Sequence, residues 1–384
     1  MSAIFTGRRC ITRRMPNPVG ALVLTGERVT RVLIDLRMVR GRLHGIARYA
    51  LELARRLPSL QPSWEFAGLT APGGIPDGLG DLKPQIPLVS CAAGFLSPWE
   101  QPALLASLSR ASCNLFHATS FSVPALWPGR LVVTLHDAIH LALPENHSWQ
   151  RLTYYRLLVG PRARFAAALI APSEFSRAEL SKHLRLNAYR FQVIHQGVGS
   201  TYHPPTEEEA RSWRNARRLP ARYLAAVGNP KLHKNLSFLA RLASSLPIPI
   251  ALAAGAGAKA ELRFPNSTIE LPALSEAEMP LLYGAAVAML HPSRYEGFGL
   301  PVLEAMASGC PVISSNSTSL PEVAGNAAQL LPPDDLEAWR QATLAVIRDA
   351  NLRHQMADRG VARAAMFSWD ECARRTLAVY ARVL

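Results

Sequence analysis

Two glutamates and two glycines stand close together in residues 291–304, which read HPSRYEGFGLPVLE. The apolar residues before this stretch predict a strand that ends at Leu290, and Pro301 favours the first turn of a helix because proline is preorganised there. The loop between the two elements offers free backbone N–H groups and the positive end of a helix dipole, which suits a pyrophosphate. Gly297 and Gly299 would let the backbone approach such a ligand closely.

The two carboxylates of this stretch would then have separate tasks. Glu304 lies one turn into the predicted helix, where it would accept hydrogen bonds from both hydroxyls of a ribose. Glu296 precedes the loop and would face the group attached to the phosphate. The alternative is an ordinary strand, loop and helix in which Glu304 is solvated, and the spacing alone does not decide between these interpretations.

An alternation of strands and helices must position these residues, and it begins near residue 31. Residues 32–36 read as a buried strand, and apolar residues at helical spacing predict a helix over 46–57 that Pro58 would end. Further strands are predicted over 131–135 and 169–171, and further helices over 151–168 and 173–184, the last of them capped by Ser173.

The same alternation restarts after the polar stretch 203–209. Strands are predicted over 223–227, 248–254, 287–290 and 311–315, with helices over 235–246 and 301–308. Such alternation predicts parallel sheets joined by right-handed crossovers, and ligands bind at the carboxyl ends of their strands. We therefore expect two doubly wound α/β domains, residues 31–202 and 203–367, that face a shared cleft. A flexible extension over 1–30 and a helix over 368–384 that packs back toward the N-terminal domain complete the expected organisation.

The charge of the chain is concentrated in one half. The 384 residues include 42 Lys and Arg and 28 Asp and Glu, a net charge of +14. Residues 1–200 carry 23 basic and 11 acidic residues, whereas residues 201–384 carry 19 and 17. This excess is dispersed arginine without the basic runs of RNA-binding modules, so an anionic surface or substrate fits it as well as nucleic acid does.

Two classes of protein do not fit the composition. No apolar run reaches the roughly 18 residues that span a bilayer. The five cysteines form no CxxC pair, which argues against a zinc ribbon or a disulfide framework and favours a reducing compartment.

The segment His291–Val312 resembles the E-x7-E segment of family 4 retaining glycosyltransferases, in which seven residues separate Glu296 from Glu304. Six further segments resemble motifs of this family in the same order: Gly41–Leu57, Leu135–Pro144, Ala171–Leu180, Ile194–Val198, Val227–Leu236 and Leu320–Gly325. One such motif would be a weak signal, but seven in order are a strong one.

The resemblance implies a GT-B fold, in which two Rossmann-like domains face each other across the donor cleft. The acceptor would lie on the N-terminal domain and the nucleotide sugar mainly on the C-terminal domain, and the family needs neither a metal nor a further cofactor. By matching position, Glu304 would hold the donor ribose. Glu296 and the backbone amides of Gly297, Phe298, Gly299 and Leu300 would face the sugar and the phosphates.

Other site residues follow from the same resemblance. Lys234 would neutralise the diphosphate from the loop that begins at Gly228, and His136 would lie across the cleft near the transferred sugar. Gly45 would let the first loop approach the donor. Pro230 stands where relatives often have an arginine, so we assign a second phosphate contact to Lys231, whose alternative is a solvated loop lysine.

The implied reaction moves a hexose from a nucleoside diphosphate sugar to an acceptor hydroxyl with retention, and Glu296 would act as a stabiliser rather than a nucleophile. The loops resemble those of bacterial GDP-mannose-dependent mannosyltransferases of surface polysaccharide synthesis. A glycan or lipid-linked acceptor at the inner face of the cytoplasmic membrane would explain the basic N-terminal half without nucleic acid. The alternatives are a UDP- or dTDP-sugar donor, a nucleotide-sugar epimerase or inactive binder, and a nucleic-acid binder.

Overall fold

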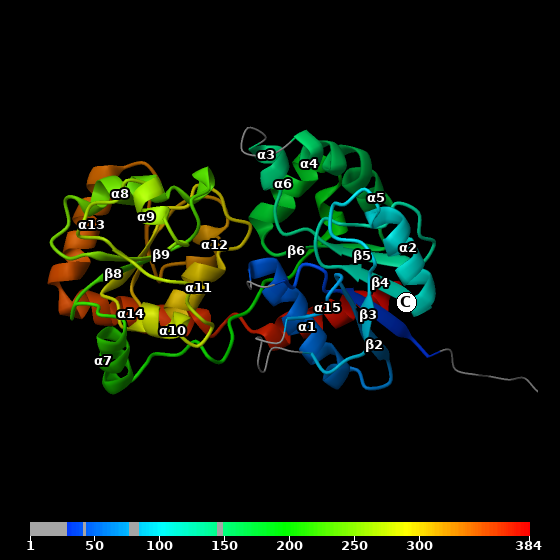
Figure 1. Cartoon of the computed structure of the whole chain (residues 1–384), viewed down its shortest axis with the longest axis horizontal. Coiled ribbons are helices and arrows are strands. Elements are labelled where there is room, and N and C mark those ends of the chain that lie inside the picture. The colour runs from blue at the N-terminus through cyan, green and yellow to red at the C-terminus, as the bar shows by residue number, and fades with distance from the viewer. Residues whose placement is uncertain (1–28, 41–43, 77–83, 144–148) are drawn as a thin grey trace, which may run out of the picture.

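The computed structural model describes residues 29–40, 44–76, 84–143 and 149–384. In this part of the chain, two α/β domains lie beside each other, and each is built on a parallel sheet with helices on both faces (Figure 1). The predicted fold class is confirmed. Residues 1–28 of the predicted extension lie outside the described residues.

The sheet of the N-terminal domain has the strand order β3-β2-β1-β4-β5-β6-β7 over the described residues. Its strands are β1 Arg31–Asp35, β2 Glu65–Thr70, β3 Leu88–Ser90, β4 Leu115–Ala118, β5 Arg130–Thr134, β6 Ala168–Ala171 and β7 Phe191–Val193. Its helices are α1 Gly45–Leu60, α2 Glu100–Ala111, α3 Ile139–Ala142, α4 Trp149–Tyr154, α5 Gly160–Phe165 and α6 Glu174–Leu184.

The sheet of the C-terminal domain has the order β10-β9-β8-β11-β12-β13 over the described residues. Its strands are β8 Leu224–Val227, β9 Ile250–Ala253, β10 Ile269–Glu270, β11 Ala288–His291, β12 Val312–Ser315 and β13 Gln329–Leu331. The helices that follow β7 in the chain are α7 Glu207–Ala216, α8 Leu236–Ala243, α9 Ala258–Glu261, α10 Met279–Gly284, α11 Leu300–Ala307, α12 Leu320–Ala324, α13 Leu336–Arg348, α14 Ala350–Ala364 and α15 Trp369–Val383.

Each sheet reverses its strand order at one point, and these points bring the candidate loops together. The order reverses between β1 and β4 in the first sheet and between β8 and β11 in the second. A doubly wound sheet binds ligands in the crevice at the carboxyl ends of such strands. The loops that leave β8 at residue 228 and β11 at residue 292 carry the predicted diphosphate residues, so the topology places them at this crevice.

Local sequence signals explain several element boundaries and miss others. Ser173 caps α6 by accepting a hydrogen bond from the Ser176 N–H, as predicted. Pro58 does not end α1, which continues to Leu60, because a proline in the last turn forfeits only one helical hydrogen bond. The predicted helix over 151–168 already ends at Phe165, and it contains a π-helical segment over Tyr155–Val159.

The last helix, α15, lies on the N-terminal domain and packs against α1 (Figure 1). Arg56 of α1 donates to Asp370 at 2.6 Å, and the Tyr380 hydroxyl lies 2.5 Å from Nδ1 of the buried His117 at the centre of the first sheet. The chain therefore crosses between the domains twice, and the two crossing segments touch at the bridge between Val198 and Ser368.

Candidate functional site

An ion pair joins two of the predicted catalytic residues at the carboxyl edge of the second sheet. The Lys234 ammonium lies 2.7 Å from Oε1 of Glu296, and their side chains are only 18% and 11% exposed. His291, the last residue of β11, donates from Nε2 to the same oxygen at 3.1 Å. Burial alone would raise the pKa of Glu296, but Lys234 and His291 together hold it well below its usual range. The carboxylate is therefore ionised and suited to charge stabilisation rather than proton donation.

The glycine loop after Glu296 presents a run of backbone donors. The Ser319 hydroxyl lies 2.9 and 2.8 Å from the carbonyl oxygens of Glu296 and Phe298 and shares its one proton between these two peptide planes of the loop. Gly299 caps α11 with a φ of +110°, a backbone conformation that favours glycine. Among the described residues, the N–H groups of 297–300 have no hydrogen-bond acceptor. Free backbone amides just before and at the start of a helix are groups that suit an anion such as a diphosphate.

The glycine loop touches the N-terminal domain at the predicted catalytic histidine. A Cβ atom at Gly297 would lie 2.2 Å from the His136 carbonyl oxygen, so only glycine permits this approach. The hydroxyl of Ser176 in α6 lies 2.9 Å from the His136 carbonyl oxygen and 2.8 Å from the Gly297 carbonyl oxygen. The structure thus brings residues 136 and 297 together from opposite domains.

The His136 ring is held by hydrogen bonds at both nitrogens. Nε2 donates to the Thr119 carbonyl oxygen at 2.9 Å, and Nδ1 accepts from the Gln196 amide at 3.0 Å. Tyr49 packs edge-on against the ring, with 5.0 Å between the ring centroids. Burial lowers the pKa of His136 to about 4, so this side chain is neutral near pH 7.

Glu304, the predicted ribose-binding residue, lies at the boundary between the domains. It is 9% exposed, so the interpretation of a solvated Glu304 is wrong. Nε of Arg48 in α1 lies 4.0 Å from its carboxylate. The same guanidinium pairs with Glu276 and stands 5.7 Å over the Tyr202 ring. Burial raises the pKa of Glu304, and the positive charge of Arg48 opposes that shift.

The other predicted residues lie around this crevice with less defined contacts. Gly45 begins α1, and a Cβ atom there would lie 3.4 Å from Leu300 of the opposite domain. Gly228 follows β8 and packs near Leu236. Lys231 is exposed, and burial lowers the pKa of His44 with a contribution from the charge of Lys231. The role of Lys231 as a phosphate contact stays a prediction.

Sequence reasoning missed the residues that support these groups. Their shared property is that each bonds a site residue from a distant part of the chain: Arg48, Ser173, Ser176, Gln196 and Ser319. Four of them lie inside the segments 41–57, 171–180 and 194–198 that resemble family motifs, and this resemblance was the signal that could have indicated them. Their bonding partners depend on how the two domains pack.

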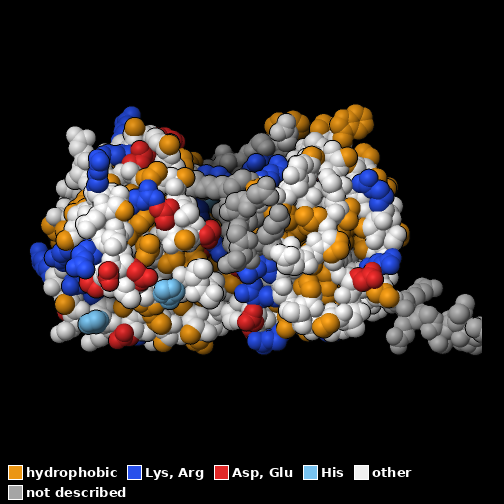
Figure 2. Space-filling model, turned by 60° about the horizontal axis from the view of Figure 1, so that its bottom comes forward, with side chains coloured by type: hydrophobic (Ala, Val, Ile, Leu, Met, Phe, Trp, Pro, Cys, Tyr) orange, Lys and Arg blue, Asp and Glu red, His pale blue; other side chains and the backbone are white. Residues whose placement is uncertain are grey.

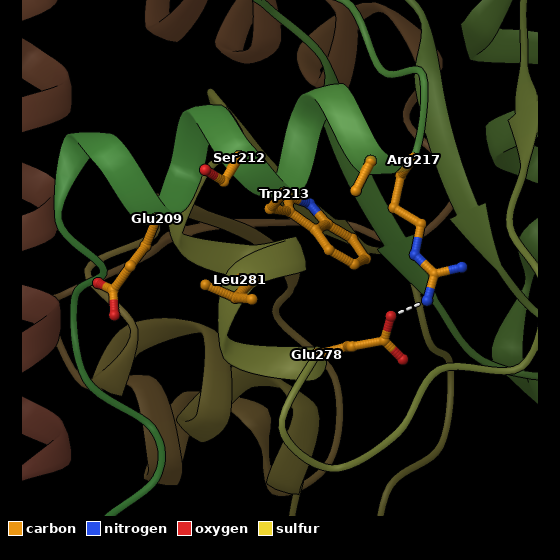
Figure 3. A pocket seen from close by; sticks show the side chains of 7 residues that line it. Glu209, Ser212, Trp213, Arg217, Glu278 and Leu281 are labelled. Atoms are coloured by element: carbon orange, nitrogen blue, oxygen red, sulfur yellow. Dashed lines mark ion pairs between the residues drawn. The ribbon is translucent and has the colours of Figure 1, made fainter.

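The molecular surface is hollowed between the two domains, with Lys and Arg side chains on its walls (Figure 2). A separate cavity of about 450 Å³ lies between α7 and α10, where the Trp213 and Leu281 side chains meet beside an ion pair between Arg217 and Glu278 (Figure 3). It contains none of the predicted site residues. Among the described residues, no group of three or more His, Cys, Asp or Glu side chains is arranged to hold a metal ion.

Two family models match successive parts of the chain. The model described as Glycosyltransferase Family 4 matches residues 43–202, and the model described as Glycosyl transferases group 1 matches residues 209–363. The first covers most of the domain that carries His136, and the second covers Lys234, Glu296 and Glu304.

One relative and two solved structures resemble the chain over nearly its whole length. The O-antigen chain mannosyltransferase B of Escherichia coli is 29% identical over 381 residues, which cover 91% of this chain and 99% of the relative. Sucrose-phosphate synthase from Thermosynechococcus elongatus matches with a TM-score of 0.77 at 19% identity, over 93% of this chain and 99% of that chain. Anabaena HepE in complex with UDP and glucose matches with a TM-score of 0.73 at 18% identity, over 92% and 99%.

Proposed function

Because the chain belongs to the family 4 and group 1 glycosyltransferases and has the GT-B fold, we propose that it transfers mannose from GDP-mannose to a glycan in surface polysaccharide synthesis. The observation that carries the proposal is the anion site at the cleft. There, the free backbone amides of residues 297–300 lie at the start of α11. On the other side of the cleft, the His136 carbonyl oxygen approaches Gly297. The name of the O-antigen relative supports mannose as the transferred sugar.

Most of the catalytic work in this proposal is stabilisation of the leaving group. The bond between the anomeric carbon and the diphosphate oxygen breaks, and the negative charge that develops on the diphosphate meets the Lys234 ammonium and the amides of 297–300. Preorganised donors and charges of this kind are usually the largest contribution to catalysis. Because the protein supplies these positive groups itself, the proposed reaction proceeds without a metal ion.

The proposed stereochemical course is retention by attack on the same face of the sugar. The acceptor oxygen bonds to the anomeric carbon, and its proton passes to the departing phosphate oxygen. Glu296 is held by Lys234 and His291 at 2.7 and 3.1 Å, which supports a role in stabilising the positively charged sugar rather than as a free nucleophile. His136, neutral and held at both nitrogens, would position the sugar rather than exchange a proton with it.

The proposed acceptor is lipid-linked at the inner face of the cytoplasmic membrane, to which the N-terminal domain would bind. Residues 149–173 contain no Asp or Glu. The helical segment 149–165 exposes three large apolar side chains and three arginines: Trp149, Leu157 and Phe165, with Arg151, Arg156 and Arg164. Aromatic side chains and arginines together suit an anionic membrane interface. Within the described residues, no helix has the length and apolarity needed to cross a bilayer.

Membrane binding is tested by flotation of the full chain with vesicles. Binding to phosphatidylglycerol vesicles but not to phosphatidylcholine vesicles is expected, with a loss on raising the salt concentration. An Arg156→Glu variant should float less, and equal flotation with both lipids would refute this part of the proposal.

A thermal-shift screen of GDP, UDP and dTDP tests the donor, since a bound ligand raises the melting temperature by mass action. We expect only GDP to raise the melting temperature. If only UDP or only dTDP does so, the donor is a sugar of that nucleotide and the proposal of GDP-mannose is wrong. Product analysis then separates a transferase from an epimerase, because an epimerase would convert the sugar nucleotide without any acceptor. The anomeric configuration of the product, read by NMR, tests retention.

A further inference from the structure

The start of α6 in the N-terminal domain is bonded to the glycine loop of the C-terminal domain. Ser173 donates from its hydroxyl to the Gly297 carbonyl oxygen at 2.6 Å, and Ser176 lies 2.8 Å from the same oxygen. Both serines are fully buried. One backbone carbonyl of the predicted diphosphate loop is therefore held from across the cleft.

The orientation of this carbonyl fixes the orientation of the next amide. The described chain contains no cis peptide, so the carbonyl of Gly297 and the N–H of Phe298 point in opposite directions within one planar group. Since the Gly297 oxygen points to α6, the Phe298 N–H points away from it. The neighbouring carbonyls of Glu296 and Phe298 are held by Ser319, which belongs to the same domain as the loop.

The two sets of contacts respond differently to domain separation. The Ser319 hydrogen bonds persist when the domains part, because both partners move together. The Ser173 and Ser176 hydrogen bonds break, and the peptide between Gly297 and Phe298 then lacks its side-chain restraint. Gly297 has no Cβ atom, so this peptide is free to rotate in the open protein.

We propose that Ser173 and Ser176 are positioning residues for the donor diphosphate, because they fix the Phe298 N–H as a donor to it only when the domains are closed. The inference rests on the proposed function, since it concerns the same anion site. It adds that the N-terminal domain shapes the diphosphate site without touching the ligand. Domain closure and diphosphate binding then favour each other.

A second contact at the same end of α6 supports this coupling. The carboxylate of Glu322 in α12 accepts hydrogen bonds from the Glu174 N–H, at 2.9 and 3.0 Å, and from Nε2 of His195 at 2.7 Å. A carboxylate at a helix N-terminus is favoured by the helix dipole. Glu322 thus docks α6 on the C-terminal domain beside the two serines, and its removal should weaken closure without touching the loop.

The test compares the affinities of the full chain for GDP and for guanosine, which lacks the phosphates. In a Ser173→Ala/Ser176→Ala variant, the GDP affinity should fall by about 10–100-fold, the size of a hydrogen bond to a charged group. The guanosine affinity should stay unchanged, which a general loss of structure would not produce. A Glu322→Ala variant should lower the GDP affinity in the same selective way, and it keeps the test available if the double variant folds poorly.

Ser181→Ala is the matched control, because within the described part of the chain the Ser181 hydroxyl bonds only the Arg177 carbonyl oxygen of α6, at 2.6 Å. It should bind GDP like the wild type. If the double variant binds GDP like the wild type, or loses equal affinity for GDP and guanosine, this inference is wrong and the proposed function still stands. A wild-type chain that binds none of GDP, UDP and dTDP would overturn the proposed function and this inference with it.

Discussion

Replacing Lys234 by alanine should reduce both stability and activity, and the structure allows the two losses to be separated. The variant leaves the Glu296 carboxylate, 11% exposed, with the 3.1 Å hydrogen bond from His291 but without its ion pair. Removing one partner of a buried pair typically costs about 3–5 kcal/mol. Because His291 remains, we expect the lower end of that range, about 3 kcal/mol. At roughly 2–4 °C per kcal/mol for a domain of this size, the melting temperature should fall by about 6–12 °C.

The loss of activity has a different origin, because the ammonium group would no longer meet the charge of the departing diphosphate. Turnover should fall by about 10²–10³-fold, as when one well-placed stabilising donor is removed. Both quantities are measurable on the same sample, by thermal unfolding and by steady-state transfer from the nucleotide sugar that stabilises the wild type.

A second substitution separates the two effects. Glu296→Gln in the Lys234→Ala background removes the unpaired charge, so most of the lost stability should return while activity stays low. The Glu296→Gln single variant completes the thermodynamic cycle. If Lys234→Ala melts like the wild type, or the double variant is no more stable than the single one, the ion pair is not buried as described. Near wild-type turnover in Lys234→Ala would refute the diphosphate role.

Three further predictions concern the domain boundary and the core. Glu304→Ala should weaken GDP binding by about 10–100-fold through lost ribose hydrogen bonds, and unchanged affinity by calorimetry would contradict the ribose role. Arg48→Met removes the positive charge that opposes the raised pKa of Glu304, so this variant should bind GDP more weakly at pH 6 than at pH 8. Arg55→Met on the same helix is the control. A GDP affinity of Arg48→Met that does not change with pH would argue against an electrostatic interaction between Arg48 and Glu304. Burial lowers the pKa of His117 to about 3, so the unfolded state takes up a proton first and stability should fall as the pH drops from about 6.5 toward 3. A His117→Gln variant should lose less melting temperature over that interval, and an equal loss would argue against a buried neutral histidine.

The parts of the fold that follow from local signals were predictable from the sequence. Apolar runs followed by glycine loops indicated β1, β8 and β11, and the carboxyl ends of neighbouring parallel strands lie at one edge of a sheet. That rule brings Lys234, after β8, beside Glu296, after β11, as the 2.7 Å ion pair shows. In β4, by contrast, the polar His117 interrupts the apolar run of the strand, so its pattern was not recognised.

The contacts between the domains were not predictable, because they depend on how two finished domains dock. Ser173 was expected to cap α6, and it does, but its second bond reaches Gly297 at a separation of 124 residues. The spacing left open whether Glu304 is solvated, and the Arg48 and Tyr202 side chains that face it are brought there by the docking of the domains. Glycine at position 297 was expected for approach to a ligand, and the structure adds the approach of the His136 carbonyl oxygen.

The return of α15 to the N-terminal domain has a consequence for biosynthesis. The hydrogen bond between Tyr380 and His117 and the packing of α15 on α1 join the last residues of the chain to its first domain. At about 5–20 residues per second, the ribosome needs on the order of 10–40 s to add the roughly 190 residues that separate β7 from the end of α15. During that interval all strands of the first sheet have been synthesised, but α15, which covers His117 and packs on α1, has not. The N-terminal domain is therefore completed only after the C-terminal domain has been synthesised, and a chain that terminates before α15 would leave His117 without Tyr380 and α1 without its packing partner.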